Sequence, residues 1–529
     1  EKVLTKIKID QHTKSLLKEA GLNLDDVLPL GKEVLLKRTA NISTGGTSTD
    51  VTDQVHPFNV FLAERIARLF QLDVCGIDIM AKDITVPIQR GNGAVIEVNA
   101  GPGFRMHTNP SKGQARNVAK PVVDMLFPDH SNGRIPIVAI TGTNGKTTTT
   151  RLVAHMAQKS GKNVGYTTTE GIYINGHTIA EGDCSGPKSA RTILADPFVD
   201  YAVLECARGG ILRSGLAFDT CDISIVTNVT EDHLGIDDIH TLEDYAQVKE
   251  VVARSTADRG YSILNAEDDL VYDMRHAVSS HVILFSIDPE NKRVLDHCDA
   301  GGMAVVVEDG FFVVKDSESS LRILAVNRVP ITYGGKAKFM IANVLPAIAA
   351  GFASGFTVED IRSALISFIP SPEMTPGRMN LFEFAHCKLM LDYAHNASGF
   401  DAIQHYMEQV DAVSKICIIG ATGDRRDEDI RNQGRYAAGM FDEIIIRHDK
   451  DSRGRKNEEL TALLLEGIRS VNTHPRVEVI SDEAAAIEFA VTNAPHESFI
   501  FVCADHVKHS IELVRKLQDK LLYSMSKVS

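Results

Sequence analysis

The chain has 529 residues, and its 56 Lys and Arg residues against 70 Asp and Glu residues give a formal net charge of −14. At about 150 residues per domain, this length predicts three or four domains and excludes a single small module. Hydrophobic residues make up 43%, charged residues 24% and aromatic residues 6% of the chain, which is typical of globular enzymes and excludes a disordered or fibrous protein. The acidic charge excludes sequence-independent binding of long nucleic acids, so any polyanionic ligand should be small, such as a nucleotide.

The cysteines and the apolar runs indicate the cellular setting. Eight cysteines are scattered along the chain without a C-x-x-C pair, which predicts reduced thiols and a cytoplasmic protein rather than a disulfide framework or a zinc site. No apolar stretch reaches the roughly 18 residues of a membrane span, so we expect no membrane partner. The chain opens at Glu1 without a start methionine or a basic signal region, and we expect it to begin inside a longer protein.

Two turn-rich stretches divide the chain. Turn-forming residues gather at 126–134, and three prolines and a glycine occur within 369–377. Because the second stretch cannot continue a helix or a central strand, we predict domains over residues 1–130, 131–372 and 373–529.

The first domain contains two strand-like runs, at 74–79 and 94–99. Acidic or amide side chains occur inside both runs. We expect the two runs to pair as antiparallel strands.

In the second and third domains, short apolar runs alternate with helical patterns. The runs lie at 135–140, 201–204, 223–226, 389–391, 416–419, 443–446 and 499–502. Such runs are typical of strands buried in a parallel sheet. We therefore predict a doubly wound α/β fold for both domains.

The sharpest local signal is T-G-T-N-G-K-T-T-T-T at 141–150, between a predicted strand and a predicted helix that stops at Gly161. Gly142 and Gly145 let backbone N–H groups converge on a phosphate, Lys146 can reach the outer phosphates, and the Thr147 hydroxyl can bind Mg²⁺. A bare Gly-Lys-Thr is often an ordinary turn. The flanking strand and helix and the four consecutive hydroxyls favour a nucleotide-phosphate site.

Further polar residues follow two strands of the second domain. Glu205 comes directly after the run at 201–204, and Asp232 and His233 follow the next strand, so all three belong at the carboxyl ends of strands, where open α/β sheets bind ligands. A carboxylate and an imidazole there could hold Mg²⁺ against a γ-phosphate. His233 alone would more often be a structural histidine, but its position relative to Glu205 and the loop favours the metal.

Polar clusters of the third domain are weaker signals. Asp392 and His395 end the strand at 389–391, where a carboxylate can accept a hydrogen bond from a ribose hydroxyl. Arg378 could bind a phosphate or carboxylate through two nitrogens. Each of these residues could equally form a surface ion pair, and Arg425 and Arg426 could be solvated loop charges.

These motifs resemble those of the Mur ligases and folylpolyglutamate synthetases, which are ATP-dependent amide-forming ligases. The shared strings are G-T-N-G-K-T at 142–147, N-V-x-x-D-H at 228–233, Gly-Arg at 377–378, D-Y-A-H at 392–395 and G-D-R at 423–425. The first domain resembles the C-terminal part of an ATP-grasp ligase, through G-I-D at 76–78, E-V-N at 97–99 and G-P-G-F at 101–104. The resemblance implies part of an α+β ATP-grasp domain, a Mur ligase-like central P-loop α/β domain and a Rossmann-like α/β C-terminal domain.

The resemblance also implies ATP and Mg²⁺ as cofactors and assigns residues to roles. The implied nucleotide contacts are Gly142, Thr143, Asn144, Gly145, Lys146, Thr147, Thr148, Asn343, Arg378 and Asp392. The implied metal ligands are Thr147, Glu205 and His233 in the Mur-like site and Asp78, Glu97 and Asn99 in the ATP-grasp part. The implied catalytic residues are Lys146, Glu205, His233 and Lys249, and the implied substrate contacts are His395, Asp424, Arg425 and Arg426, with Ser43, Gly45 and Gly46 in the first domain.

Lys249 falls where many Mur ligases carry a carbamylated lysine as a metal ligand. An unmodified, exposed helix lysine is the commoner state of such a residue, and both alternatives stay open.

A partial ATP-grasp domain joined to a complete Mur-like unit resembles two-site ligases that build a peptide from Asp and Arg. This implies that the ATP-grasp site lengthens an aspartate backbone and that the Mur-like site adds Arg to each aspartate β-carboxyl through an acyl phosphate. The front of the ATP-grasp domain is missing, so the first domain cannot add aspartate as it stands. The implied partners are Arg, Asp, ATP and a primer of both amino acids, and we expect a homo-oligomer.

Three other functions fit the same motifs less well. One is a Mur-type ligase with another acceptor, such as a folate or peptidoglycan precursor, and a second is a ligase that polymerises Asp–Arg dipeptides. The third is a regulatory protein that only senses or hydrolyses ATP. An Arg substrate would need an acidic pocket, for which Asp424, Asp427, Glu428 and Asp429 are candidates, although a solvated charge run explains them equally well.

Overall fold

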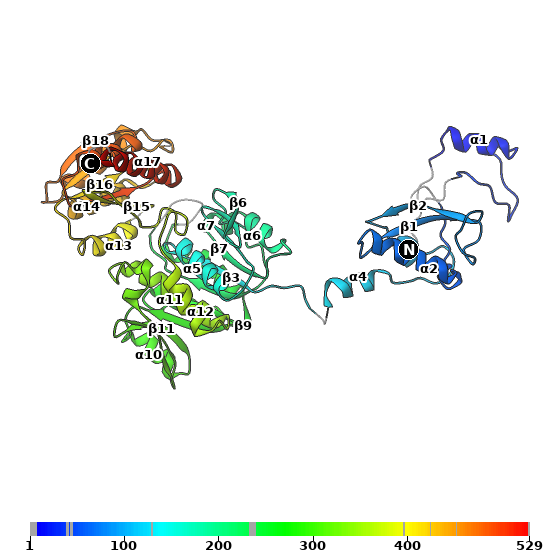
Figure 1. Cartoon of the computed structure of the whole chain (residues 1–529), viewed down its shortest axis with the longest axis horizontal. Helices are drawn as coiled ribbons and strands as arrows, with labels where there is room; N and C mark the ends of the chain where they lie inside the picture. Colours follow the sequence, from blue (N-terminus) through cyan, green and yellow to red (C-terminus); the bar gives the residue numbers. More distant parts are fainter. Residues whose placement is uncertain are drawn as a thin grey trace. The chain divides into compact units, whose positions relative to one another are not determined.

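The computed structural model describes residues 8–38, 42, 46–128, 131–231, 240–394, 397–423, 425–450 and 452–526. These residues fold into two compact units, Glu1–Arg134 and Ile135–Ser529 (Figure 1). None of the described helices is both long and apolar enough to cross a membrane. All eight cysteines are free, and seven of them are buried.

The first unit is built around one two-stranded antiparallel sheet. Strands β1 (Gly76–Ala81) and β2 (Gly93–Asn99) pair with Asp78 directly opposite Glu97. The predicted antiparallel pairing is therefore confirmed. The helices of this unit are α1 (Gln11–Glu19), α2 (Pro57–Leu69), α3 (Arg105–Thr108) and α4 (Ala119–Leu126), with a 3₁₀ turn η2 (Thr52–Gln54).

The second unit contains an eleven-stranded mixed sheet with the order β13-β12-β11-β10-β9-β8-β3-β7-β4-β5-β6. Its central strands run parallel, as predicted, whereas β5, β12 and β13 pair antiparallel with their neighbours. These antiparallel edges were not predicted. The strands are β3 (Ile137–Thr141), β4 (Val164–Thr168), β5 (Gly171–Ile174), β6 (His177–Glu181), β7 (Tyr201–Glu205), β8 (Cys221–Val226), β9 (Thr256–Asn265), β10 (His281–Ser286), β11 (Met303–Glu308), β12 (Phe311–Lys315) and β13 (Ser320–Ala325).

Helices cover both faces of this sheet because its buried strands are apolar on both sides. Along β3, Val138 and Ile140 pack in the cluster that contains α5 and α11, and Ile137 and Ala139 pack in the cluster that contains α6. The helices are α5 (Lys146–Lys159), α6 (Pro187–Leu194), α7 (Arg208–Ser214), α8 (Leu242–Arg254), α9 (Asp269–Asp273), α10 (Lys292–Asp299), α11 (Lys338–Ala353) and α12 (Val358–Ser367), with 3₁₀ turns η4 (Met274–His276), η5 (Val326–Arg328) and η6 (Pro330–Thr332).

A second sheet of six strands has the order β14-β15-β19-β16-β17-β18. All of its strands run parallel except β14 at the edge, which confirms the α/β prediction for this part. The strands are β14 (Asn380–Glu383), β15 (Cys387–Asp392), β16 (Lys415–Ile419), β17 (Glu443–Ile446), β18 (Arg476–Val479) and β19 (Ser498–Cys503). The helices are α13 (Ala397–Met407), α14 (Asp427–Met440), α15 (Asn457–Arg469), α16 (Glu483–Asn493) and α17 (Val507–Ser526).

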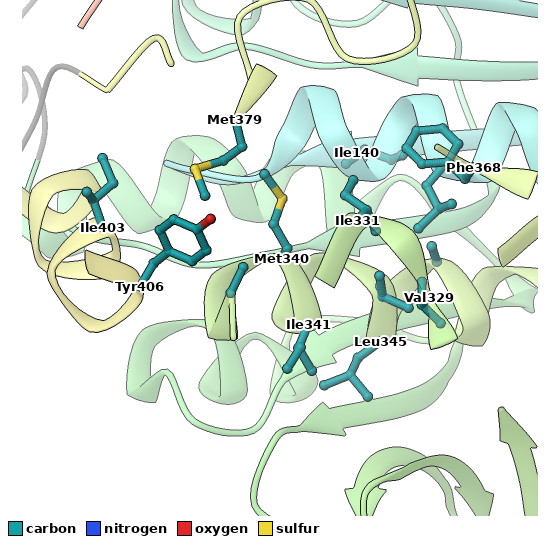
Figure 2. Close-up of a cluster of buried hydrophobic side chains, with 14 of the residues drawn as sticks. Ile140, Val329, Ile331, Met340, Ile341, Leu345, Phe368, Met379, Ile403 and Tyr406 are labelled. Atoms are coloured by element: carbon teal, nitrogen blue, oxygen red, sulfur yellow. The ribbon is translucent and has the colours of Figure 1, made fainter. Parts of the chain in front are cut away.

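One hydrophobic cluster runs between the two sheets of the second unit. Figure 2 shows Met340 of α11 close to Met379, Ile403 and Tyr406, which come from the part of the chain around the second sheet. The Tyr333 hydroxyl also donates a hydrogen bond to the backbone carbonyl of Met379. This packing brings the carboxyl ends of strands from both sheets toward one cleft.

Candidate active site

The loop between β3 and α5 has a backbone that only glycine adopts easily. Gly145 has a φ of +86° and Gly142 a φ of +149°, in the region that L side chains avoid. A Cβ atom at Gly145 would stand 2.1 Å from Asn343 Oδ1, and one at Gly142 would stand 1.8 Å from Thr227 Oγ1. The two glycines therefore let Thr227 and Asn343 approach the loop closely.

The end of β8 braces this loop through two residues that the sequence reasoning missed. Asn144 N donates to Asn228 Oδ1 at 2.9 Å, and Asn228 Nδ2 donates to Asn144 O at 3.1 Å. Thr227 Oγ1 donates to the same Asn144 carbonyl at 2.6 Å. Asn228 follows β8, which pairs with the strand β3 that leads into the loop. An amide at this place, within the N-V-x-x-D-H string, could have been predicted to contact the loop.

Glu205 lies at the carboxyl end of β7 with only 2% of its surface exposed. Its Oε2 accepts hydrogen bonds from Thr147 Oγ1 at 2.9 Å and from Thr169 N at 3.3 Å. Its Oε1 has no hydrogen-bond partner among the described residues. Burial raises the pKa of Glu205 to about 7, and the positive charge of Lys146 opposes that rise.

This pair suits a hard cation. A threonine hydroxyl and a carboxylate are oxygen donors of the kind that Mg²⁺ prefers, and a buried carboxylate oxygen without a partner is costly unless a ligand satisfies it. No group of three or more His, Cys, Asp and Glu side chains within the described ranges could hold a metal. His233, the predicted third ligand, lies outside the described residues.

Both predicted catalytic lysines contact the loop. Lys146 Nζ donates to the carbonyls of Gly142 at 3.1 Å and Thr143 at 2.8 Å. Lys249 is fully buried, its Nζ donates to the Gly142 carbonyl at 2.8 Å, and the same atom stands 4.0 Å from the centre of the Tyr245 ring. The exposed helix lysine considered as an alternative for Lys249 is therefore wrong, and its carbamylation stays a prediction.

The predicted nucleotide contacts around the second sheet also gather here. Arg378 Nη2 lies 3.3 Å from Glu170 Oε1, and its guanidinium lies 5.2 Å from the centre of the Tyr393 ring. Asp392 ends β15, is 8% exposed, and accepts a hydrogen bond from Met379 N at 2.8 Å. Burial raises the pKa of Asp392, and Arg378 acts in the opposite direction.

A cleft of about 1350 Å³ joins these groups. It is lined by the phosphate-loop residues 143–148, by Glu205 and Asn343 beside them, and by Arg378 and Asp392 from the other part of the unit. The structure thus brings together most of the predicted nucleotide contacts, from four separate segments of the chain. A cleft with a phosphate loop, a buried carboxylate and converging cations can hold a nucleoside triphosphate and polarise its terminal phosphate.

The predicted substrate contacts are less well supported. Arg426 Nη2 donates at 2.8 Å to both Glu231 Oε2 and Asp429 Oδ1, and the Arg425 carbonyl accepts from Arg455 Nη1 at 3.4 Å. Neither residue lines the cleft. The predicted residues Ser43, Gly45, His395 and Asp424 lie outside the described residues, and Gly46 belongs to the first unit.

The acidic run after Asp424 pairs with the chain's own arginines. Asp427 lies 2.9 Å from Arg455, and Glu428 lies 2.5 Å from Arg435. Asp429 pairs with Arg426 in the same helical turn. These three carboxylates already neutralise resident guanidinium groups, so they do not form an open pocket for a further one.

The first unit holds a separate set of oxygen donors. Asp78 and Glu97 face each other across the strand pair, and Asn99 Nδ2 donates to Glu97 Oε1 at 3.0 Å. All three side chains are exposed and lie on one face of the sheet. The register places Asp78 opposite Glu97, and the role of the three side chains as metal ligands stays a prediction.

Two family descriptions match the second unit: the Mur ligase middle domain over residues 140–351 and the Mur ligase glutamate ligase domain over residues 377–506. Together they cover more than half of the chain, and the chain belongs to the Mur ligase family. At 47% identity over 516 residues, it is similar to the cyanophycin synthetase of Crocosphaera subtropica, and at 46% over 516 residues to that of Geminocystis herdmanii. Both alignments cover 98% of this chain and 59% of the relative, so the chain spans about three fifths of the length of these relatives.

Solved structures agree with the fold. A bifunctional folylpolyglutamate synthase/dihydrofolate synthase, crystallised with Mn, AMPPNP and L-glutamate bound, matches with a TM-score of 0.55 at 18% identity. The match covers 74% of this chain and 91% of that one. At this identity the likeness establishes the Mur ligase-like α/β fold.

Proposed function

We propose that the second unit is an ATP-dependent ligase that attaches arginine to the β-carboxyl groups of an aspartate chain, as in the synthesis of cyanophycin, multi-L-arginyl-poly-L-aspartate. The observation that carries this proposal is the buried Glu205–Thr147 pair beside a glycine-built phosphate loop inside one cleft. The similarity to cyanophycin synthetases supports the choice of substrates.

In the proposed reaction, the β-carboxylate attacks the γ-phosphate of ATP, and the bond to ADP breaks as an acyl phosphate forms. The α-amine of arginine then attacks the acyl carbon, loses a proton and displaces phosphate. Lys146 is positioned to spread the charge that develops on the transferred phosphoryl group. Mg²⁺, held by Thr147 and Glu205 with His233 as the proposed third ligand, would neutralise phosphate charge when bound.

Other residues would orient the nucleotide. Asn343 packs against Gly145 at the start of α5 and would help to place the nucleotide above the loop. Asp392 would accept a hydrogen bond from a ribose hydroxyl, and Arg378 would contact phosphate from the opposite wall of the cleft. Lys249, buried against the Gly142 carbonyl, would hold the loop from below or, if carbamylated, join the metal ligands.

For the first unit we propose the C-terminal part of an ATP-grasp domain, with Asp78, Glu97 and Asn99 as its Mg²⁺ ligands. Three oxygen donors on one sheet face fit that role chemically. Contacts of Ser43, Gly45 and Gly46 with an aspartate substrate, and aspartate addition once the front of an ATP-grasp domain is present, belong to the same proposal. So do the three-domain division at residues 130 and 372, cytoplasmic location and homo-oligomeric assembly.

ADP release from the purified chain distinguishes the candidate functions. We expect release only with arginine and a primer of aspartate and arginine together. Release with an Asp–Arg dipeptide alone would favour the dipeptide-polymerising ligase, and release with a folate or peptidoglycan precursor would favour another Mur-type acceptor. Release that ignores every acceptor would favour a nucleotide-hydrolysing regulatory protein.

Lys146→Ala tests the role of the loop in that assay. Removing a cation that stabilises the transferred phosphoryl group should lower arginine-dependent ADP release by at least about 100-fold. Lys159→Ala, at the exposed last turn of the same helix, is the matched control and should retain the wild-type rate. Full activity of Lys146→Ala would overturn the proposed mechanism.

A further inference from the structure

Glu170 connects two arginines that come from distant segments of the second unit. It lies two residues beyond β4, at the carboxyl end of that strand. Its Oε1 is 3.3 Å from Arg378 Nη2, and its Oε2 is 3.5 Å from Arg151 Nη2. One carboxylate therefore links helix α5, which follows the phosphate loop, to the segment just before β14.

Arg151 is the fixed partner of this link. Its side chain is 4% exposed, its guanidinium lies 4.6 Å from the centre of the Tyr173 ring and 5.8 Å from that of Tyr166, and Nη2 donates to the Tyr173 hydroxyl at 2.8 Å. The two tyrosine rings are themselves stacked at 4.7 Å. A guanidinium held by burial, two rings and a hydroxyl has little freedom, so it anchors one oxygen of Glu170.

The backbone of Glu170 is tied to the Glu205–Thr147 pair through its neighbour. Thr169 N donates to Glu205 Oε2 at 3.3 Å, and Thr169 Oγ1 lies 3.2 Å from Thr147 Oγ1. The Thr169 hydroxyl also donates to Glu170 Oε1 at 3.3 Å. The position of Glu170 is thus fixed relative to the proposed metal-binding oxygens.

Arg378 is the less restrained partner. Its side chain is 21% exposed in the cleft, with Nη1 donating to the Gly377 carbonyl at 3.1 Å and its guanidinium beside the Tyr393 ring. A guanidinium has five N–H donors, so contacts with Glu170 and Gly377 leave others for a ligand. Without Glu170, a long cationic side chain would sample many rotamers in the cleft.

We infer that Glu170 is a positioning residue, which holds the Arg378 guanidinium in line with the Glu205–Thr147 pair so that it meets the transferred phosphate. The inference deepens the proposed function and rests on its assignment of Arg378 to the nucleotide. Glu170 acts through Arg378 and is not itself a phosphate ligand, because its negative charge would repel one.

This role predicts a specific split between rate and binding. In Glu170→Gln, Arg378 stays in the cleft but loses its alignment, and kcat for ADP release should fall about tenfold, since small misplacements of positioned groups cost rate. Affinity for a non-hydrolysable ATP analogue should not weaken, because one negative charge near the triphosphate has been removed. A general structural defect would instead weaken both and lower the melting temperature.

A double-mutant cycle completes the test. Arg378→Lys keeps the charge but loses the planar fork, and in that background Glu170→Gln should cause no further loss of kcat. The matched control is Asp309→Asn, which breaks an exposed ion pair with Arg322 at 2.7 Å away from the cleft and should leave kcat within about twofold of wild type.

Several outcomes would overturn the inference. These are an unchanged kcat in Glu170→Gln, losses that multiply in the double variant, or analogue binding and melting temperature that fall together with the rate. If wild-type ADP release proves independent of arginine, the arginine-ligase proposal fails. The double-mutant cycle can then still be measured with the arginine-independent rate of ADP release. If wild type releases no ADP at all, the cycle is read on analogue affinity, where two independent losses would overturn the inference.

Discussion

The phosphate-loop site and the strand pair of the first unit use similar oxygen donors in opposite surroundings. Glu205 is 2% exposed, shares one oxygen with Thr147 and Thr169, and has a pKa raised by burial to about 7. Asp78 and Glu97 are exposed and face each other on a sheet of two strands. The first site is held in place by burial and hydrogen bonds, whereas the carboxylates of the second lie on an exposed sheet face.

The difference follows from how each sheet is covered. Parallel strands buried on both faces let helices and neighbouring strand ends close around a loop, as Thr227 and Asn343 do at Gly142 and Gly145. A two-stranded antiparallel sheet is only marginally stable by itself. In the first unit it leaves Met80 at 71% and Ile96 at 62% exposure, so its donors sit on a poorly covered scaffold.

The largest expected effect concerns the loop itself. Gly145→Ala places a methyl group against Asn343 Oδ1 in a left-handed backbone conformation, and we expect it to cost about 3 kcal/mol of stability. The matched control is Gly161→Ala, with a similar φ of +80° but no atom within 4 Å of the added Cβ, which should cost only about 1 kcal/mol. Urea unfolding measures both.

Nucleotide binding sharpens the same comparison. Gly145→Ala should also weaken binding of an ATP analogue, since Asn343 must move, while Gly161→Ala should bind as wild type does. Equal losses of unfolding free energy in both variants would mean that close contacts do not hold the loop. The contrast with the first unit would then be wrong.

A smaller effect concerns titration in the buried region. His155, also on α5, bonds to Ser367 Oγ at 2.9 Å, and burial, with a further contribution from Lys159, lowers its pKa to about 4. The folded state therefore resists protonating His155, so its stability falls as the pH drops from about 6.5 toward 4.

We compare urea unfolding of wild type and His155→Gln at pH 7.5 and pH 5. Wild type should lose about 1 kcal/mol more than the variant across this range, a figure reduced for the partial exposure of the ring. Identical losses of unfolding free energy in the two proteins would show that burial does not lower the pKa of His155.

Much of this architecture could be predicted from the sequence, because the runs that became β3, β7, β8, β15, β16, β17 and β19 are mostly apolar and pair with parallel neighbours. Glu205 and Asp392, at the ends of two of those strands, line one cleft. Lys249 was harder, since a lysine in a helix gives no sign that tertiary packing buries it against the Gly142 carbonyl.

Glu170 and Thr169 were missed for a related reason. They follow β4, whose sequence V-G-Y-T-T is too short and polar to stand out as a strand, so no strand end was expected there. The hairpins at β5–β6 and β12–β13 were missed likewise. The acidic run at 427–429 could be read from the sequence as a pocket for an arginine substrate or as ordinary surface charges. Its ion pairs with Arg426, Arg435 and Arg455 favour ordinary surface charges.

The smallest expected effect lies in the first unit. Like charges directly opposite on paired strands destabilise a sheet, so Asp78→Asn should slow hydrogen–deuterium exchange at residues 76–99 without divalent cation, by about 0.5 kcal/mol. Added Mg²⁺ should protect the same strands in wild type but not in the variant if Asp78 and Glu97 hold the cation as proposed. Asp83→Asn, which removes a turn-capping carboxylate that bonds Thr85 in the same unit, is the control: it should weaken protection and keep the Mg²⁺ response. If Mg²⁺ protected neither protein, the strand pair would be an ordinary exposed hairpin, and only the buried site would remain a candidate for metal-assisted chemistry.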